Sequence, residues 1–215
     1  MSDTEKDLLE GQTVAIIGAG SMGGSIARGL VESGALPGEQ VLVCDHNPGK
    51  LAALAQQAGV RTFSTSAEML AEKPGIVVLA VKPQVLAAVL EQHAADLDGA
   101  LVVSIAAGVT LATLEAALPG ARVVRVMRNL PVSVRSGASA ITGGASAGEA
   151  DVATVQALFA TLGSAKVMRE DQLDAEGAVV GCAPAYFALM VDALTRAGIR
   201  AGLRATDARE MVSAT

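Results

Sequence analysis

Three glycines between Gly18 and Gly23 have the spacing of a phosphate-binding turn. They stand in the order GxGxxG directly after Val14 to Ile17, an apolar run typical of a buried strand. In this pattern the first glycine allows a tight turn, the second lets a pyrophosphate approach the backbone, and the third lets the next helix pack closely on the strand. The free N–H groups and positive dipole end of that helix face the turn. The segment therefore predicts a dinucleotide site.

The residues around the turn supply the strand–helix–strand context that the motif requires. Met22, Ile26 and Leu30 recur at helical spacing after the glycines. Val41 to Cys44 is the next apolar strand. This context distinguishes the motif from a chance match in a chain with 23 glycines.

Asp45 ends the second strand, where a carboxylate accepts a hydrogen bond from the adenosine ribose 2′-OH. A carboxylate there repels a 2′-phosphate, so Asp45 favours NADH over NADPH. His46, when protonated, and Lys50 soften this repulsion. We therefore expect a cofactor-binding role for Asp45 and His46, with NADPH or NADH as the cofactor and NADH accepted at least as well.

Composition narrows the class of partner. The chain has 215 residues, is 51% hydrophobic, and has a formal charge of -6 and a pI near 4.9. This negative net charge does not provide the positively charged surface that attracts nucleic acid or an anionic membrane. Residues 1–11 lack the apolar core of a signal peptide, and no apolar run is expected to be long enough to cross a bilayer. We expect a cytoplasmic protein with a small-molecule substrate, no nucleic acid and no membrane.

The cysteines and histidines fit no metal site. Cys44 and Cys182 lie far apart and match no metal or redox spacing, so both are interpreted as reduced thiols. His93 is interpreted as a solvated residue on a helix. No metal is expected.

Strands and helices alternate along most of the chain, which predicts an α/β fold of the Rossmann-like, doubly wound type with a mainly parallel sheet. Thr65 and Thr110 are predicted helix caps, and Ser146 to Glu149 has the form of a capping box. The strand expected over 136–142 is less surely parallel than the others. The expected strands cover residues 14–17, 41–44, 61–63, 76–81, 101–106, 122–127, 136–142 and 165–168.

From residue 171 the alternation stops and helix follows helix, over 171–180, 184–200 and from 206. We therefore expect a smaller all-helical C-terminal domain. The final helix has no stop signal before Thr215, so this domain is expected to be truncated. The predicted division is a polar N-terminal tail over 1–11, a dinucleotide-binding domain over 12–169, and an incomplete helical dimerisation domain over 170–215.

Five segments together resemble the pyrroline-5-carboxylate reductase family in order and spacing. The resemblance covers almost the whole chain from Val14 onward, and its most specific part is the sequence SIAAGVTL. The five segments are Gly18 to Gly23, Ala80 to Gln84, Val103 to Leu111, Val126 to Pro131 and Pro184 to Tyr186.

The resemblance implies an enzyme of proline biosynthesis. Members of that family reduce the ring C=N bond of 1-pyrroline-5-carboxylate to give L-proline, with NADPH or NADH as the hydride donor. Their C-terminal helices intertwine with those of a second subunit, which implies a homodimer or higher homo-oligomer. The exposed apolar stripe expected from Phe187, Met190, Val191 and Leu194 agrees with such an interface.

The resemblance also carries site residues over to this chain. The residues of the glycine turn are expected to hold the pyrophosphate. Those at the ends of the fourth and fifth strands are expected to line the path of the nicotinamide half. These cofactor-binding residues are Gly18, Ala19, Gly20, Ser21, Met22 and Gly23, then Ala80, Val81, Lys82 and Pro83, then Ser104 and Ala106. Asn129 follows the sixth strand and is expected near the substrate.

The chain departs from the family pattern in ways that leave its chemistry open. Arg128 and Leu130 flank Asn129 where the family has proline and threonine, and Val180 to Pro184 lacks the usual serines. The family's substrate-binding loop would follow Thr215, so the catalytic residues stay unassigned, with Asn129 and Arg128 as nearby candidates. On these residues alone we expect dinucleotide binding with poor reduction. The alternatives are a dinucleotide-binding or regulatory protein without turnover, and a related imine or β-hydroxyacid reductase.

Overall fold

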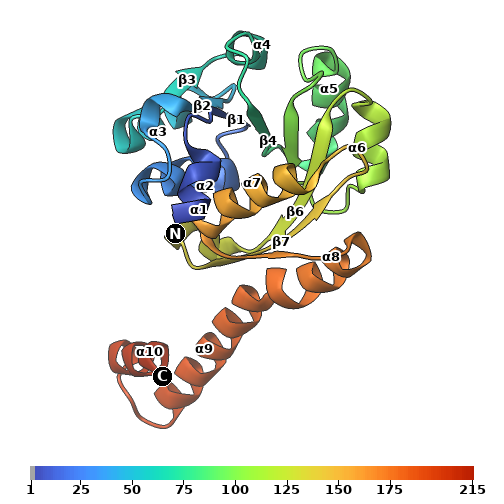
Figure 1. Ribbon diagram of the computed structural model, residues 1–215. Coiled ribbons are helices and arrows are strands. Elements are labelled where there is room, and N and C mark those ends of the chain that lie inside the picture. Colours follow the sequence, from blue (N-terminus) through green and yellow to red (C-terminus); the bar gives the residue numbers. More distant parts are fainter. Residues whose placement is uncertain (1–2) are drawn as a thin grey trace.

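The computed structural model describes residues 3–215, with side chains from residue 6 onward. One eight-stranded sheet in the order β3-β2-β1-β4-β5-β6-β7-β8 forms the centre of this part of the chain (Figure 1). The order reverses between β1 and β4, which is the arrangement of a doubly wound sheet. The strands are β1 (Val14–Ile17), β2 (Val41–Cys44), β3 (Arg61–Phe63), β4 (Ile76–Leu79), β5 (Leu101–Ser104), β6 (Arg122–Arg128), β7 (Gly137–Gly143) and β8 (Gly163–Val167).

Strands β1 to β6 pair in parallel, which confirms the predicted mainly parallel sheet. Strand β7 pairs antiparallel with β6, and β8 then pairs parallel with β7. Strands β1, β2, β4 and β5 are buried along their whole length because helices cover both faces. Their carboxyl ends meet at one edge of the sheet.

The helices form two layers, one on each face. Helices α1, α2, α3 and α7 contribute to the apolar cluster on one face, and α4, α5 and α6 to the cluster on the other. The helices are α1 (Asp3–Leu9), α2 (Ser21–Glu32), α3 (Pro48–Ala58), α4 (Ser66–Leu70), α5 (Pro83–His93), α6 (Leu111–Ala117), α7 (Glu149–Ala160), α8 (Glu170–Glu176), α9 (Ala183–Arg200) and α10 (Ala205–Ala214). Short helical turns are η1 (Gly38–Gln40), η2 (Leu130–Val134) and η3 (Gly177–Gly181).

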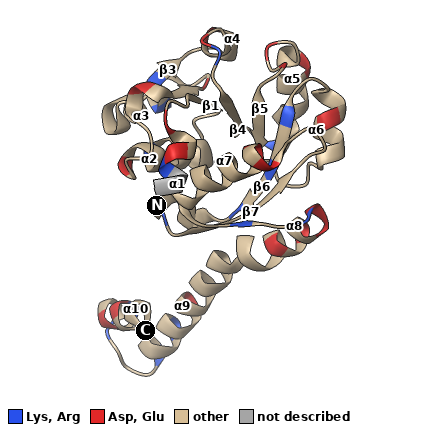
Figure 2. Ribbon diagram, in the orientation of Figure 1, with Lys and Arg blue, Asp and Glu red and all other residues tan. Residues whose placement is uncertain are grey.

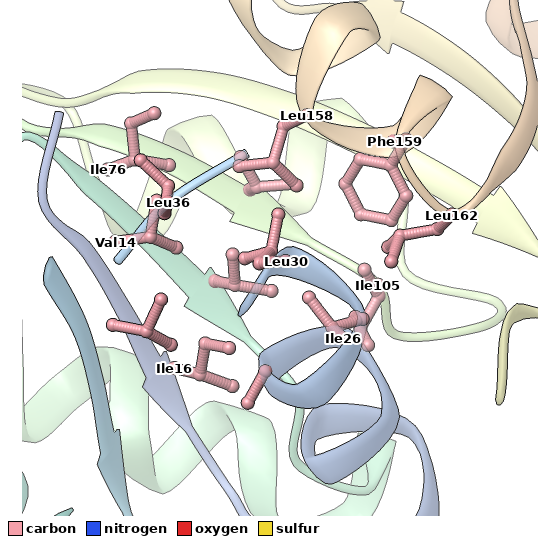
Figure 3. Packing of buried hydrophobic residues seen from close by; sticks show 14 of the residues in the cluster. Val14, Ile16, Ile26, Leu30, Leu36, Ile76, Ile105, Leu158, Phe159 and Leu162 are labelled. Carbon is pink, nitrogen blue, oxygen red and sulfur yellow. The ribbon is translucent and has the colours of Figure 1, made fainter. Parts of the chain in front are cut away.

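Alternate residues of β1 enter opposite cores, as expected for a strand with both faces covered. Val14 and Ile16 join the cluster beneath α2 and α7, whereas Ala15 and Ile17 join the other. Figure 3 shows Ile16 and Ile26 in the first cluster, with Phe159 of α7 closing it. This packing fixes the start of α2 against the end of β1 and so positions the glycine turn.

The polar N-terminal tail expected over 1–11 is helical and docked where the structure describes it. Residues Asp3–Leu9 form helix α1, which contacts α7. Leu9 is fully buried in the cluster beneath α2 and α7. Leu8, which is partly buried, packs against the same cluster, so two apolar residues at the end of an otherwise polar stretch dock it.

Two local predictions were wrong. The N-cap of α7 is Gly148 rather than Ser146, because the helix begins only at Glu149, and the N–H of Gly148 donates to the side chain of Asp151. His93 is 1% exposed rather than solvated. Its Nε2 lies 2.6 Å from Ser66 Oγ and its Nδ1 lies 2.9 Å from Asp96, so partners on α4 and after α5 replace water.

The C-terminal helices extend away from the sheet (Figure 1). Helices α9 and α10 contact one another, and none of the side chains of α9 is buried. The apolar residues predicted to form a stripe stay open, with Phe187 at 67%, Met190 at 59% and Leu194 at 57% exposed. Figure 2 shows that charged residues are sparse along this helix.

We expected no apolar run long enough to cross a membrane, and this prediction is wrong. By length and composition alone, the helical segment Glu170–Arg200 qualifies, because it has 31 residues and contains an 18-residue stretch with a mean hydropathy of 1.6. The reason is that α8, η3 and α9 follow one another almost without interruption, since Pro184 sits in the first turn of α9, where a proline is tolerated.

Candidate functional site

The turn from β1 to α2 is tightly packed at Gly18 and Gly23 and open at Gly20. Gly18 has φ +109°, and a Cβ there would lie 2.7 Å from the carbonyl oxygen of Ala80. A Cβ on Gly23 would overlap the carbonyl oxygen of Gly18. A Cβ on Gly20 would meet no atom within 4 Å. The turn is therefore packed against β4 on one side and leaves open space beside Gly20, the shape required for a phosphate to reach the backbone.

The first turn of α2 carries nothing that competes for an anion. Gly20 is its N-cap and supplies no side-chain hydrogen bond, and the first turn contains no acidic residue. The hydroxyl of Ser25 donates to the carbonyl oxygen of Ser21, at 2.6 Å, and so leaves the leading N–H groups free. A 12-residue helix with uncapped N–H groups at a glycine turn fits a pyrophosphate.

Asp45 is built into this turn. It is 9% exposed, and its Oδ2 accepts a hydrogen bond of 2.8 Å from the N–H of Ala19. Its Oδ1 accepts one of 2.9 Å from the N–H of Asn47. His46 Nδ1 lies 3.5 Å from Oδ1 and Lys50 Nζ lies 3.6 Å from Oδ2. The carboxylate thus ties the end of β2 to the glycine turn.

The contacts of Asp45 keep it ionised. Burial by itself raises the pKa of this carboxyl, but the N–H groups of Asn47 and Ala19 and the charges of Lys50 and His46 outweigh burial and hold the pKa below its usual value. Next to it, burial and the Asp45 charge raise the pKa of the Cys44 thiol to about 11. Cys44 is therefore a protonated, unreactive thiol at neutral pH.

The ends of β4 and β5 lie on the same edge of the sheet as the glycine turn. Ala80 packs directly against Gly18, and Lys82 is the exposed N-cap residue of α5. Ser104 is fully buried, and its hydroxyl accepts a hydrogen bond from the N–H of Ala106, which is itself 4% exposed. Ser104 and Ala106 thus shape the edge through the backbone, and the hydroxyl of Ser104 is turned inward.

Asn129 ties three elements together at the end of β6. Its Oδ1 accepts a hydrogen bond of 2.8 Å from the N–H of Ala138, and its Nδ2 donates to the carbonyl oxygen of Val180 at 3.4 Å. The first bond holds β6 to β7, and the second holds β6 to η3. The amide of Asn129 therefore fixes where the C-terminal helices meet the sheet.

Two charged residues, Arg128 on β6 and Glu176 on α8, have unmatched polar atoms. Arg128 is half-buried, burial lowers its pKa, and its Nε has no hydrogen-bond partner among the described residues. Glu176 is half-buried at the end of α8, burial raises its pKa, and its Oε2 likewise has no partner within the described chain. Arg128 was expected on a loop, whereas it is the last residue of β6.

No potential metal centre is present within residues 3–215, since no three His, Cys, Asp or Glu side chains gather there. Cys182 is an exposed free thiol at the start of α9. The chemistry available at this edge is therefore the binding of a phosphate-bearing ligand at the glycine turn, and a half-buried cation, Arg128, lies at the end of β6.

Comparison with known proteins agrees with this geometry. Residues 13–108 match a family model described as NADP oxidoreductase, coenzyme F420-dependent, and residues 170–215 match one described as pyrroline-5-carboxylate reductase dimerisation. A pyrroline-5-carboxylate reductase from Arabidopsis thaliana is 37% identical over 203 residues, which cover 94% of this chain and 73% of the relative. The chain belongs to the pyrroline-5-carboxylate reductase family.

Solved structures of reductases of this family superpose closely on the chain. A pyrroline-5-carboxylate reductase from Coxiella burnetii has a TM-score of 0.86 at 30% identity, over 94% of this chain and 76% of that one. A pyrroline carboxylate reductase from Plasmodium falciparum with NADP bound has a TM-score of 0.84 at 26% identity, over 94% and 75%. The family's fold, a dinucleotide-binding sheet followed by helices, is thus the fold of this chain.

The sequence analysis missed one network that orients the C-terminal helices of this chain. Arg125 of β6 is 2% exposed, and its guanidinium pairs with Glu170 at 3.1 Å and with Asp174 at 2.9 Å, both on α8. Glu170 also accepts a hydrogen bond of 2.6 Å from the N–H of Leu111. An arginine in the middle of the apolar strand RVVRVMR was the available signal, because a buried charge requires a partner.

Proposed function

We propose that this protein reduces the ring C=N bond of 1-pyrroline-5-carboxylate to L-proline. The observation that carries the proposal is the combination of family membership with a glycine turn that is open at Gly20. A nicotinamide dinucleotide, when bound, supplies the hydride. The chain's own residues need only orient the two reactants, hold the substrate carboxylate and exclude water.

We assign the cofactor to the carboxyl edge of the sheet. Gly18 to Gly23 hold the pyrophosphate, and Ala80 to Pro83 line the path of the nicotinamide half. The open space at Gly20, the uncapped start of α2 and the shared edge of β1, β4, β5 and β6 support this assignment. These residues belong to the proposed dinucleotide-binding domain over 12–169.

Arg128 is the proposed partner of the substrate carboxylate. Its side chain is partly desolvated at the end of β6 and makes no ion pair with any carboxylate in the described part of the chain. A cation in that condition gains most from an anionic ligand, and arginine can bind a carboxylate with two parallel hydrogen bonds. Asn129 is assigned a positioning role, since both ends of its amide already bond to the backbone.

Cofactor preference rests on Asp45. Each of its oxygens accepts one backbone hydrogen bond and retains a further lone pair for the ribose 2′-OH. A 2′-phosphate at that place meets a carboxylate whose low pKa keeps it charged. We therefore propose that NADH is accepted at least as well as NADPH, and that Asp45→Asn shifts the ratio of the two affinities toward NADPH.

The C-terminal helices are the proposed dimer interface. The match of residues 170–215 to a dimerisation family supports this, together with the exposed apolar side chains of Phe187, Met190 and Leu194. A partner subunit that covers this surface also explains why the segment Glu170–Arg200 is both long and apolar, and this explanation requires no membrane. We propose a cytoplasmic homodimer or a higher homo-oligomer.

The function is tested by following steady-state oxidation of NADH and of NADPH with racemic 1-pyrroline-5-carboxylate, and by identifying proline among the products. Proline formed in proportion to cofactor oxidised is the expected result. Thermal stabilisation by both dinucleotides with no proline formed would overturn the proposal in favour of a binding protein without turnover.

The role of Arg128 is tested with Arg128→Gln. We expect KM for the substrate to rise by about tenfold or more with little change in kcat, because a carboxylate contact made equally in ground and transition states affects binding alone. Arg122→Gln, at the opposite end of β6, is the matched control. An unchanged KM in a folded Arg128→Gln variant would remove Arg128 from the site.

A further inference from the structure

A pocket of about 440 Å³ lies between the first turns of α2 and helix α3, next to the glycine turn. It opens at the place where the end of β2 meets that turn, since Lys50 lines it and also approaches Asp45. The lining residues that matter here are Ala19, Gly20, Ser21, Arg28, Lys50 and Ser133.

Arg28 supplies the less expected of the two cations. It is half-buried on the second turn of α2, and its Nη2 donates to Ser25 Oγ at 3.4 Å. Its Nη1 would lie 3.7 Å from a Cβ placed on Gly24, so the guanidinium folds back along α2 toward the glycine turn. Within residues 6–215, whose side chains are described, Arg28 takes part in no ion pair.

The ionised carboxylate of Asp45, which Lys50 approaches, is already engaged by backbone donors. Asp45 does not line the pocket, and its two oxygens accept hydrogen bonds from the N–H groups of Ala19 and Asn47. Lys50 lies 3.6 Å from it on the pocket side. The pocket itself is therefore lined by two cations and by the hydroxyl groups of serines, with no carboxylate among its lining residues.

We propose that this pocket receives the 2′-phosphate of NADPH, with Arg28 as the specificity-determining residue. A phosphate monoester carries close to two negative charges at neutral pH, and arginine binds it with paired hydrogen bonds. The proposal rests on the proposed dinucleotide function and deepens it. Asp45 accepts the ribose 2′-OH of NADH, whereas Arg28 and Lys50 offset its repulsion of NADPH, so one site accepts both cofactors.

The test is calorimetric binding of 2′,5′-ADP and of 5′-ADP, which differ only in the 2′-phosphate. We expect Arg28→Gln to weaken 2′,5′-ADP by about tenfold or more and to leave 5′-ADP within about twofold. Lys166→Gln removes the same charge from exposed strand β8 and should change neither affinity. Inorganic phosphate is the third ligand, and it should bind far more weakly than 2′,5′-ADP.

Each other outcome overturns the proposal. Equal loss of both nucleotides in Arg28→Gln would place Arg28 at the pyrophosphate or in the stability of α2, and no loss would remove it from the site. Inorganic phosphate as tight as 2′,5′-ADP would make the pocket a general anion site. If 5′-ADP and NADH do not bind the parent protein, the proposed dinucleotide function itself fails. If they bind, but Arg28→Gln does not change the ratio of the 2′,5′-ADP and 5′-ADP affinities, this inference alone fails.

Discussion

The sheet domain and the C-terminal helices differ in how much apolar surface they bury. In the sheet domain, strands β1, β2, β4 and β5 are buried throughout, and each face has its own closed core. In α9 no residue is buried, although the helix carries Phe187, Met190 and Leu194. The first half is complete as a folded unit, whereas the second presents a surface that fits another protein surface.

The difference shows how the chain separates its tasks. The sheet domain has small openings, and one of them, beside Gly20 between α2 and α3, suits a small ligand. The helical segment is connected to it by few strong contacts, chiefly Arg125 with Glu170 and Asp174. Substitutions in the first half should therefore affect ligand binding and folding, and those in the second should affect assembly.

The largest effect is expected from charges placed on the exposed face of α9. The double change Phe187→Glu and Met190→Glu should weaken dimerisation about a thousandfold, roughly 4 kcal/mol, because it puts two unpaired charges where the proposed dimer buries apolar side chains. Sedimentation over a range of concentrations measures this. Asp192→Ser, on the same helix in an exposed pair with Arg196, is the control and should dimerise normally. Dimerisation unaffected by the double change would place the interface elsewhere.

The next largest effect separates two glycines of one motif. Gly23→Ala should lower the free energy of unfolding by about 2 kcal/mol, since the new methyl group overlaps the backbone of Gly18. Gly20→Ala meets open space and should change it by less than about 0.5 kcal/mol. Urea unfolding of both variants gives the comparison. Equal losses from the two would mean that the turn is not packed as described.

A smaller effect is expected where the two halves join. Arg125→Met should cost about 1 kcal/mol, because Asp174 is 78% exposed and can be solvated when its partner is lost. Amide hydrogen exchange should quicken in α8 with little change in β1 or β4. Arg61→Met breaks an exposed pair with Glu72 and is the control. Uniform exchange in Arg125→Met would show that α8 is held by other contacts.

The smallest effect is a pH dependence within the sheet domain. The folded state depresses the pKa of Asp45, so its stabilising contribution is complete above the pKa of an unfolded aspartate, about 3.9, and is lost as pH falls through the lower folded value. Urea midpoints measured from pH 6 downward should therefore fall more steeply in the parent than in Asp45→Asn. Parallel curves would indicate that the bond to Ala19 adds nothing.

Much of this fold could be predicted from the sequence because local signals and burial agree. The four buried strands are short apolar runs, and the glycine turn and the cap residues Thr65 and Thr110 identify the ends of helices. The misses arise where a distant residue decides. Leu9 is buried where α1 contacts α7, and the ring of His93 reaches Ser66, 27 residues earlier in the chain, although its second partner, Asp96, is local.

The site was less accessible to prediction from sequence. The spacing of the glycines indicates their different packing, and Asp45 follows from its distance along the chain. That Arg28 folds back over Gly24 depends on the rotamer of a long side chain, and the unpartnered state of Arg128 depends on what lies around β6. Spacing alone determines neither property.

A π-helical turn over Gly177–Gly181 joins α8 to α9. A π turn accommodates one residue more than an α turn, and each residue of an α-helix rotates the chain by about 100°. The extra residue is therefore taken up within the turn beside Gly177, which lies against Met127, and α9 leaves the turn in nearly the direction of an uninterrupted α-helix one residue shorter. Deleting a single residue within this turn would leave the apolar stripe of Phe187 and Met190 facing nearly the same way, whereas deleting one at the start of α9 would swing it by roughly a quarter of a turn. The direction of assembly thus tolerates a change of residue count at one place in the helix and not at the next.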